Sequence, residues 1–414
     1  MRIALVHYSF LPVIGGVELV LAQHARLFAN AGHTVTILCG RGAARTALSE
    51  NTGAKPKVIV IAELDATSEI VEAAQAEVLV GSPGAAFGKA RARVRAAIAP
   101  LLQAQDVVIV HNVLTMHFHL ALTSVLWDLA DEWRNVRFLC WVHDLALCNP
   151  DYTLPPADRA PWRLLAQAHP HITYVAVSPL RVRQFAALTN QPSDRCRAIA
   201  NGVDPLIDLP SQLSALEQRH ALACRDFLLL QPVRLLRRKN VEFTLEVIAA
   251  IKSLGHTCGA LVTAPPDVHH AASADYEQEL RIHRDRLGLE EDVFFLSEHE
   301  ALTSAHLGSL FQFADALFFP SRQEGFGIPL LEAALHRLPI FCADIEPLNG
   351  LLSSSVTTFS PNAQAAAVAA LIVEKLGADA AFHARKETLR RYTWAGIYES
   401  AIAPLLAEPN QIKS

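Results

Sequence analysis

The 414-residue sequence predicts an α/β protein with two Rossmann-like domains, each built on a doubly wound parallel sheet. Three observations lead to this prediction. Short apolar runs alternate with longer segments of helical spacing, such as Val17 to Ala31. The runs lack polar alternation, which is typical of strands covered on both faces, as in parallel sheets. The pattern starts again half-way along the chain, and the length suits two domains of about 200 residues each.

The expected strands fall into two groups. In the first half they are residues 3–8, 34–38, 57–61, 106–110, 137–142 and 173–177. In the second half they are residues 226–235, 259–264, 293–296, 315–320, 339–343 and 356–360. Residues 198–212 contain Asn-Gly, two prolines and no helical period, which is typical of a linker. We therefore predict a first domain over residues 1–205 and a second over residues 206–392, which face each other across a cleft.

The composition narrows the class of protein. Hydrophobic residues make up 51% and charged residues 19%, which is typical of a globular chain. The net charge of −5 argues against a general nucleic-acid binder. The seven cysteines form no CxxC pair and indicate buried free thiols in a reducing compartment. Without a signal-peptide pattern, or an apolar run of roughly 18 residues, we expect a cytoplasmic protein that touches a membrane only from outside, if at all.

Ligands of open α/β sheets bind outside the carboxyl ends of the strands, so the loops that follow strands matter most. In the first such loop, Gly15 and Gly16 stand where a helix begins. Glycine allows close approach of the backbone, and the helix start offers free N–H groups to an anion. The loop matches neither GxGxxG nor a P-loop. It is either a phosphate seat or an ordinary turn between strand and helix.

A basic segment follows the first strand of the second half. Arg234 and Lys239 are five positions apart in PVRLLRRKN. A guanidinium and an ammonium group at a strand end suit a diphosphate, which carries at least two negative charges. The alternative is a solvated basic loop.

The strongest signal is the segment 318–341, where an apolar strand runs into a loop and a helix. Gly325 and Gly327 precede Pro329, which we place at the first helical position because its missing N–H costs nothing there. The free N–H groups of this helix start would form a second anion site. Glu324 in the loop and Glu332, expected on the first helical turn, flank that site. Carboxylates repel phosphate, so we expect them to accept hydrogen bonds from sugar hydroxyls.

These residues resemble the retaining GT-B glycosyltransferases of family four, the group 1 glycosyl transferases. The family's E-x7-E element appears as Glu324 to Glu332, and its phosphate-binding pair as Arg234 and Lys239. Further matches are GGVE at 15–18, the hinge sequence NGVD at 201–204, VHD at 142–144, and Trp394 with Tyr398 in the last helix. The resemblance covers most of the chain. It implies that a helix at about 393–408 crosses back to the first domain.

The resemblance also implies roles. His143 would lie beside the reacting carbon, Glu324 would contact the donor sugar, and Arg234 and Lys239 would hold the diphosphate. These four are the implied catalytic residues. The implied donor-binding residues are Gly15, Gly16, Gly325, Phe326, Gly327, Glu332, Ser297 and Glu298. Weaker candidates for acceptor contact are His111, Asn112 and Asp144. One departure is Thr263-Ala264-Pro265-Pro266 after a strand, where the family is often glycine-rich, so the base pocket is expected to differ.

Family members keep the anomeric configuration of the donor sugar. A double displacement would need a carboxylate nucleophile on the opposite face of the sugar, and the sequence offers no obvious one. The resemblance favours front-face transfer, in which the leaving diphosphate helps to deprotonate the acceptor. Cationic residues and helix N–H groups would stabilise the charge, so we expect neither a metal nor a cofactor.

Two other clusters have competing interpretations. His111, His117 and His119 lie close together in the sequence, but no cysteine or carboxylate accompanies them at zinc-ligand spacing, so we expect no metal site. Lys89, Arg91, Arg93 and Arg95 spread over more than one helix face. They form either a solvated helix or a site for a phosphorylated acceptor or an anionic lipid.

The predicted partners are a nucleotide-sugar donor, with GDP-mannose or UDP-glucose favoured over ADP-glucose, and a hydroxyl acceptor. The acceptor could be a small polyol, a glycerate-type acid, a sugar or a lipid-linked glycan. The main rival is a sugar-nucleotide-binding scaffold without activity. Phosphorolysis with pyridoxal phosphate would need a much longer chain. The sequence leaves the oligomeric state open.

Overall fold

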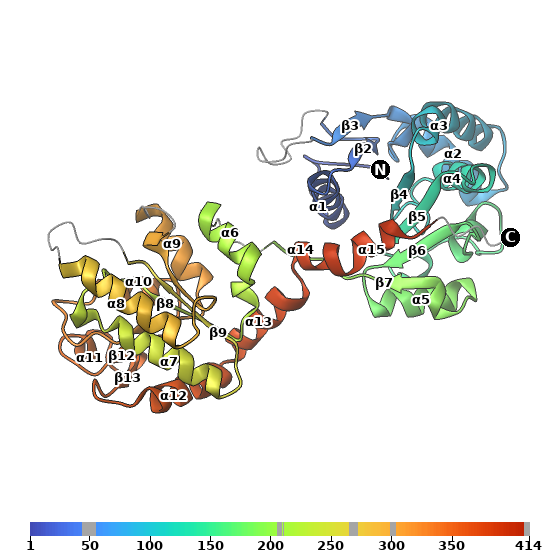
Figure 1. The fold of residues 1–414 in the computed structure, drawn as a ribbon. Coiled ribbons are helices and arrows are strands. Elements are labelled where there is room, and N and C mark those ends of the chain that lie inside the picture. The colour runs from blue at the N-terminus through green and yellow to red at the C-terminus, as the bar shows by residue number, and fades with distance from the viewer. Residues whose placement is uncertain (44–54, 205–208, 210, 265–271, 299–303, 410–414) are drawn as a thin grey trace. The chain divides into compact units, whose positions relative to one another are not determined.

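The computed structural model describes residues 1–43, 55–204, 209, 211–264, 272–298 and 304–409. These residues form two compact units (Figure 1). The first, here the N-terminal unit, comprises the described residues of Met1–Val203 and Trp394–Ser414. The second, the C-terminal unit, comprises those of Asp204–Thr393. Pro265 and Pro266, at the departure from the family pattern, lie outside the described residues, as does part of the expected linker.

The N-terminal unit contains a seven-stranded parallel sheet in the order β3-β2-β1-β4-β5-β6-β7. Its strands are β1 (Arg2–Val6), β2 (Thr34–Cys39), β3 (Lys57–Val60), β4 (Val107–His111), β5 (Arg137–Val142), β6 (Ile172–Ala176) and β7 (Cys196–Ala198). Its main helices are α1 (Gly16–Asn30), α2 (Glu69–Val80), α3 (Ala85–Gln103), α4 (Leu120–Glu132) and α5 (Pro179–Thr189).

Alternate residues of these strands build two cores, one on each face of the sheet. Ile3 and Leu5 of β1 pack with α1, whereas Ala4 and Val6 pack in the cluster that includes α3 and α4 residues. This is the two-sided burial that continuous apolar runs predict. Of the expected strands in this half, none is missing, but β7 was not predicted. It has only three residues, two of them exposed, and therefore leaves no apolar run in the sequence.

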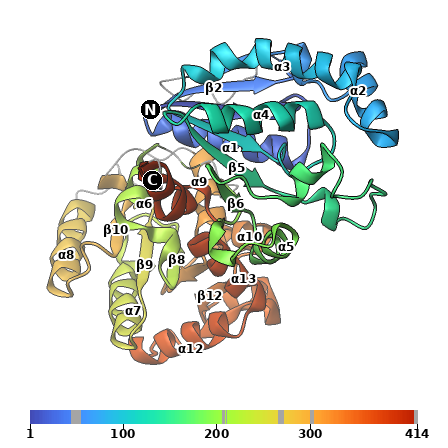
Figure 2. The same cartoon turned by 90° about the vertical axis from the view of Figure 1, so that its right-hand side faces the viewer.

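The C-terminal unit repeats this plan, as Figure 2 shows from another side, with a six-stranded parallel sheet in the order β10-β9-β8-β11-β12-β13. Its strands are β8 (Phe227–Gln231), β9 (Cys258–Val262), β10 (Val293–Phe295), β11 (Ala316–Phe319), β12 (Ile340–Ala343) and β13 (Thr357–Phe359). Its helices are α6 (Ser211–His220), α7 (Val241–Ser253), α8 (Ala272–Arg286), α9 (Ser304–Phe313), α10 (Ile328–Leu335), α11 (Leu348–Leu351), α12 (Ala365–Gly377) and α13 (Ala380–Arg391). The strand predicted at 226–235 is too long, because β8 ends before Pro232, which has no N–H for a sheet.

Each sheet reverses its strand order once, between β1 and β4 and between β8 and β11. In doubly wound sheets this switch point opens a crevice at the carboxyl ends of the strands, where ligands bind. The loops after β1 and β4 in one unit, and after β8 and β11 in the other, are therefore the places to look for a site.

The end of the chain packs on the N-terminal unit. Helix α14 (Trp394–Ile397), a π-helical turn (Tyr398–Ile402) and α15 (Ala403–Ala407) bury Trp394 and Leu405 against the α1 side of the sheet. Arg137 of β5 donates hydrogen bonds to the carbonyl oxygens of Leu405 and Glu408, each 2.7 Å away. A Cβ on Gly202 would lie 2.8 Å from the Trp394 ring, so only glycine fits beside this tryptophan.

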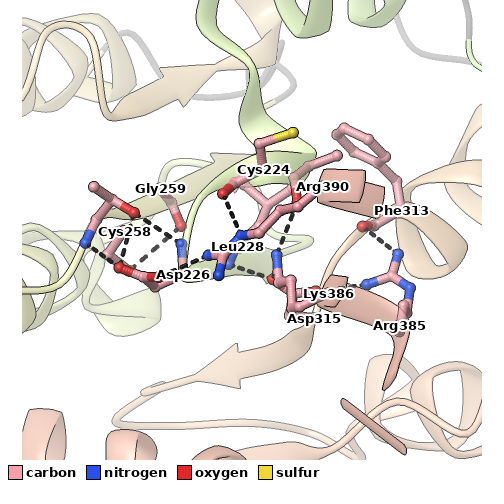
Figure 3. Close-up of polar contacts among 12 residues, drawn as sticks. Cys224, Asp226, Leu228, Cys258, Gly259, Phe313, Asp315, Arg385, Lys386 and Arg390 are labelled. Atoms are coloured by element: carbon pink, nitrogen blue, oxygen red, sulfur yellow. Dashed lines mark hydrogen bonds and ion pairs between the residues drawn. The ribbon is translucent and has the colours of Figure 1, made fainter. Parts of the chain in front are cut away.

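A polar network fixes helix α13 to the C-terminal sheet at the amino ends of strands β8 and β11 (Figure 3). The Asp315 carboxylate is fully buried and contacts Lys386 and Arg385, with 2.5 Å to the Arg385 Nη1. It also accepts a hydrogen bond of 2.8 Å from the Leu228 N–H. This network lies before β8 and β11, away from their carboxyl ends, and therefore stabilises the unit rather than forming its site.

No helix among the described residues is long and apolar enough to cross a membrane.

Candidate functional site

In the C-terminal unit, the loops after β8 and β11 bring Lys239 and Glu324 together. The Lys239 Nζ lies 2.5 Å from the Glu324 Oε1, although the residues are 85 positions apart. Both side chains are largely buried, with 13% and 7% of their surface exposed. The ammonium group also lies 5.5 Å from the centre of the Phe319 ring. Two residues with separate predicted roles thus form one buried ion pair at the switch point.

The backbone that holds this pair is fixed by buried polar side chains. Asn240 has a left-handed conformation, with φ of 57°, and its Nδ2 donates to the Pro320 carbonyl oxygen at 3.2 Å. The Arg322 N–H donates to the Arg238 carbonyl oxygen at 2.8 Å. The fully buried Gln231 side chain donates to the Lys239 carbonyl oxygen at 2.9 Å. Sequence analysis missed Gln231 and Asn240. For Gln231, a polar residue at the end of an apolar strand was the available signal.

The other cations of this segment differ in their surroundings. The Arg234 side chain is exposed and has neither a hydrogen bond nor an ion pair with any described residue. Arg237 turns to Glu279, 2.7 Å away, in an exposed ion pair. Arg238 donates to the Gln323 carbonyl oxygen at 3.1 Å and lies 3.8 Å from the Glu324 carboxylate. Of the predicted phosphate pair, Arg234 is thus open to a ligand, whereas Lys239 is engaged by Glu324.

The loop after Glu324 leads into α10 much as predicted, with one correction. Gly327 caps the helix with φ of 107°, and a Cβ there would lie 2.6 Å from Leu348, so glycine is required. The helix starts at Ile328, which places Pro329 one position later than predicted. The first turn is filled by residues 328–331, so Glu332 is the fifth helical residue and lies on the second turn, whereas the sequence predicted it on the first.

The open side of this loop is exposed to solvent. A Cβ on Gly325 would meet no atom within 4 Å, and Phe326 is 51% exposed. The Glu332 carboxylate is half-buried and makes no hydrogen bond with a described residue. Gly325, Phe326 and Glu332 are therefore accessible, as donor-binding residues must be.

Ser297 and Glu298 form a short turn after β10. The Glu298 carboxylate is held by Arg281 at 3.1 Å and Arg284 at 3.3 Å, both from α8. The Ser297 hydroxyl is buried and has no hydrogen-bond partner within the described ranges. Of the two residues predicted to contact the base, Glu298 is therefore engaged in ion pairs within the unit, whereas the Ser297 hydroxyl can still form a hydrogen bond.

In the N-terminal unit, the ends of β4 and β5 bring the predicted histidine and acceptor residues together. The His111 Nδ1 lies 3.2 Å from the His143 Nε2. The Asn112 Oδ1 accepts hydrogen bonds from the N–H groups of His143 and Asp144, at 3.1 and 2.8 Å, from a left-handed backbone with φ of 62°. Asp144 pairs with Arg181 of α5 at 2.8 Å. The Asn112 side chain thus shapes the VHD loop.

The environment keeps His143 neutral. Burial, followed by the neighbouring His7, lowers the pKa of His143 from 6.5 to about 3. Across the ordinary pH range the ring therefore carries one proton and offers one hydrogen-bond donor and one acceptor.

The glycine loop after β1 contains a carboxylate that the sequence analysis did not single out. The Glu18 Oε1 accepts a hydrogen bond of 2.5 Å from the Ser9 hydroxyl and lies 3.7 Å from the His7 Nε2. A Cβ on Gly15 would lie 2.3 Å from the Glu18 Oε2, so this glycine makes room for the folded-back carboxylate. A Cβ on Gly16 would meet no atom within 4 Å. Of the two glycines, Gly16 is therefore the one with space for a phosphate.

Glu18 should make the stability of the N-terminal unit depend on pH. The neighbouring His7, followed by the hydrogen bond from Ser9, lowers the pKa of Glu18 from 4.5 to about 2. A lowered pKa adds stability above the unfolded value, which is lost as the pH falls towards the folded value. The urea midpoint of the wild-type protein should exceed that of Glu18→Gln at pH 6, and the difference should shrink between pH 4.5 and pH 2. A constant difference would contradict this assignment.

The histidines of the β4–α4 loop do not form a cluster. His119 caps α4 by accepting from the Leu122 N–H at 3.2 Å, and its Nε2 lies 2.9 Å from the Glu63 carbonyl oxygen. His117 packs against Phe118 and Tyr152, with ring centres 4.5 Å apart in both cases. Within the described ranges, no group of three histidine, cysteine or acidic residues is arranged to hold a metal ion.

The basic residues of α3 are mostly neutralised inside the N-terminal unit. Arg91 pairs with Asp128, Arg93 with Glu63 at 2.8 Å, and Arg95 with Glu132 at 2.5 Å. Three of the four cations thus have carboxylate partners. This favours the solvated-helix interpretation over a phosphate or lipid site.

Sequence models of two families match nearly all of this architecture. The Glycosyltransferase Family 4 model matches residues 14–205, and the Glycosyl transferases group 1 model matches residues 215–385. The chain therefore belongs to the group 1 glycosyltransferases, and its two Rossmann-like units are those of the GT-B fold.

The chain is also similar to individual proteins. It is 23% identical to an uncharacterized glycosyltransferase of Methanocaldococcus jannaschii over 239 residues. The aligned segment covers 55% of this chain and 58% of that protein. The chain is 23% identical over 271 residues to mannosylglucosylglycerate synthase of Petrotoga mobilis, covering 59% and 62%. The matches thus span less than two thirds of either relative.

Among solved structures, similar chains include sucrose-phosphate synthase from Thermosynechococcus elongatus, with 16% identity, a TM-score of 0.39 and 98% coverage of both chains. Another is HepE of Anabaena in complex with UDP and glucose, with 18% identity, a TM-score of 0.38, and 99% and 100% coverage.

Proposed function

We propose that this protein transfers a hexosyl group, with retention of configuration and without a metal ion, from a nucleoside-diphosphate sugar to a hydroxyl acceptor. The observation that carries the proposal is the buried ion pair of Lys239 and Glu324, held on a rigid turn at the switch point of the C-terminal sheet. The same two loops carry the exposed guanidinium of Arg234 and lead into α10. Membership in the glycosyltransferase family supports this use of the site.

The ion pair gives a physical account of donor binding. A diphosphate attracts both the exposed Arg234 and the Lys239 ammonium group. When Lys239 turns to the phosphate, the Glu324 carboxylate loses its partner and can accept hydrogen bonds from the donor sugar. Glu332, on the second turn of α10, is accessible to the ribose. The free energy of donor binding would therefore be used in part to separate the existing ion pair of Lys239 and Glu324.

The transfer itself breaks the bond between the anomeric carbon and the diphosphate oxygen and forms a bond from that carbon to the acceptor oxygen. The acceptor proton passes to the departing diphosphate, so no protein base is needed. Arg234, Lys239 and the N–H groups near Gly327 stabilise the charge that develops on the diphosphate. His143, neutral in its environment, contributes a hydrogen bond near the reacting carbon.

The donors to test first are GDP-mannose and UDP-glucose. The name of one relative, mannosylglucosylglycerate synthase, supports mannosyl donors and glycerate-type acceptors as an early choice. A lipid-linked acceptor receives little support from α3, because most of its cations are neutralised.

The experiment incubates the protein with an α-linked donor and a panel of small acceptors, and follows the nucleoside diphosphate released. The anomeric proton of the product, read by NMR, is expected to show an α linkage. A β-linked product would contradict retention. Binding of donor with neither transfer nor hydrolysis would instead support the scaffold interpretation.

A further inference from the structure

A fully buried histidine lies beneath the His111–His143 pair in the N-terminal unit. His24 of α1 has no exposed surface. Its ring centre lies 4.5 Å from that of Trp141, 5.2 Å from that of His111, and 5.5 Å from those of Phe28 and Trp394. The cage joins α1, β4, β5 and the C-terminal segment. An aliphatic side chain would fill such a cage without bringing two polar nitrogens into it.

The rings around His24 share an unusual number of unpaired polar atoms. Neither ring nitrogen of His24 has a hydrogen-bond partner among the residues that the structure describes, and the same holds for the His111 Nε2 and the Trp141 Nε1, all buried. Buried polar groups in folded proteins are nearly always satisfied, if not by protein atoms then by an ordered internal water with about three hydrogen bonds. One nitrogen on each of these three neighbouring rings can pair with a single shared occupant.

We infer the orientation of that occupant from the donor and acceptor chemistry of these atoms and from the contact between His111 and His143. The Trp141 Nε1–H can only donate, whereas each neutral imidazole can offer one nitrogen as an acceptor. A water molecule can accept from Trp141 and donate one hydrogen to His24 and the other to the His111 Nε2. His111 then carries its proton on Nδ1, the nitrogen that lies 3.2 Å from the His143 Nε2.

We propose that His24 is a positioning residue for His143. Together with His111 and Trp141 it forms an internal site for one water molecule, which fixes His111 as the Nδ1–H tautomer. His111 donates to the His143 Nε2, and His143 therefore carries its proton on Nδ1 and presents a hydrogen-bond donor. With its Nε2 lone pair occupied, His143 is a donor and not a base. The tautomer assignment does not depend on the proposed function, whereas the kinetic consequence given below rests on that function.

The tautomer is measured directly by NMR on protein labelled with 15N-histidine, without any substrate. His111→Gln and His143→Gln assign the signals. In the wild-type protein, His111 and His143 are both expected to be protonated on Nδ1. In His24→Phe, which keeps an aromatic ring in the cage, the His143 signals should shift towards a mixture of tautomers. An unchanged His143 tautomer in this variant, or an Nε2–H tautomer in the wild type, would overturn the proposal.

Two further variants separate positioning from packing. His24→Gln retains a side chain that can donate and accept, and should keep the tautomer fixed even if it is less stable. His169→Phe replaces another buried histidine of the same unit. His169 packs on Trp127 and not in the cage around His24, so this variant should leave the His143 tautomer unchanged. If His169→Phe also changes the His143 tautomer, the effect is general loosening and the proposal fails.

If the protein transfers sugar as proposed, His24→Phe should lower kcat by on the order of tenfold to a hundredfold, with the KM for the donor unchanged. His24→Gln should restore most of the rate. A normal rate with a changed tautomer would contradict the role of His143 as donor, whereas inactivity of the wild type would count against the proposed function and leave the NMR result standing.

Discussion

Replacement of Lys239 by alanine is expected to lower kcat/KM for sugar transfer roughly 30- to 1,000-fold, which corresponds to about 2–4 kcal/mol of transition-state stabilisation. Gln231 and Asn240 fix the backbone of the turn that carries Lys239, so once its ammonium group has turned to the diphosphate it does not need to move further when charge develops there. Its loss also leaves the buried Glu324 carboxylate with Arg238, 3.8 Å away, as its one cationic neighbour among the described residues.

The control for this variant is Arg237→Ala in the same turn. Arg237 is exposed and pairs with Glu279, away from Glu324, so its removal should change the rate less than about twofold, as expected for a surface ion pair. Steady-state rates with a saturating acceptor measure both effects. Near-normal turnover by Lys239→Ala would refute its placement at the diphosphate.

Replacement of Asp315 by alanine is expected to destabilise the C-terminal unit by about 3–5 kcal/mol, the usual cost of removing one partner of a buried ion pair. The carboxylate is fully buried and receives Lys386, Arg385 and the Leu228 N–H (Figure 3). Without it, the Lys386 ammonium group, itself 5% exposed, remains in the core, where the Ala223 carbonyl oxygen is its one other hydrogen-bond acceptor in the described part of the chain.

Urea unfolding followed by circular dichroism measures this loss, and Glu387→Gln serves as the control. Glu387 lies on the same helix and pairs with Arg391 at the surface, so its removal should cost less than about 0.5 kcal/mol. Equal midpoints for Asp315→Ala and Glu387→Gln would show that the network does not hold α13 to the sheet.

Most of the fold could be predicted because it depends on local pattern. Runs such as RFLCWV are buried on both faces, and the structure shows β5 at 137–142, as predicted. What failed depended on more than pattern. The strand β7 is too short to leave a signal, and the end of β8 was set by Pro232. Glu332 was predicted on the first turn because α10 was expected to start at Pro329. The helix starts one residue earlier, directly after Gly327, so Glu332 falls on the second turn.

The candidate site could be predicted only as a set of residues. The sequence placed Lys239 and Glu324 near strand ends, but their contact depends on the left-handed backbone at Asn240 and its bond to Pro320. Likewise, the carboxylates that neutralise Arg93 and Arg95 come from segments 30 and 37 positions away. Tertiary packing determines which residues pair in this way, and the periodicity of hydrophobic residues in the sequence carries no information about it.

We propose that the C-terminal unit holds a donor site that needs no metal ion. The decisive measurement is a titration of the protein with GDP-mannose, UDP-glucose and ADP-glucose, with and without EDTA, followed by heat release and by nucleoside diphosphate formed. We predict that one donor binds at micromolar strength and is slowly hydrolysed, equally well in EDTA. Loss of binding in EDTA, or no binding by any of the three, would contradict the account of Arg234, Lys239 and Glu324.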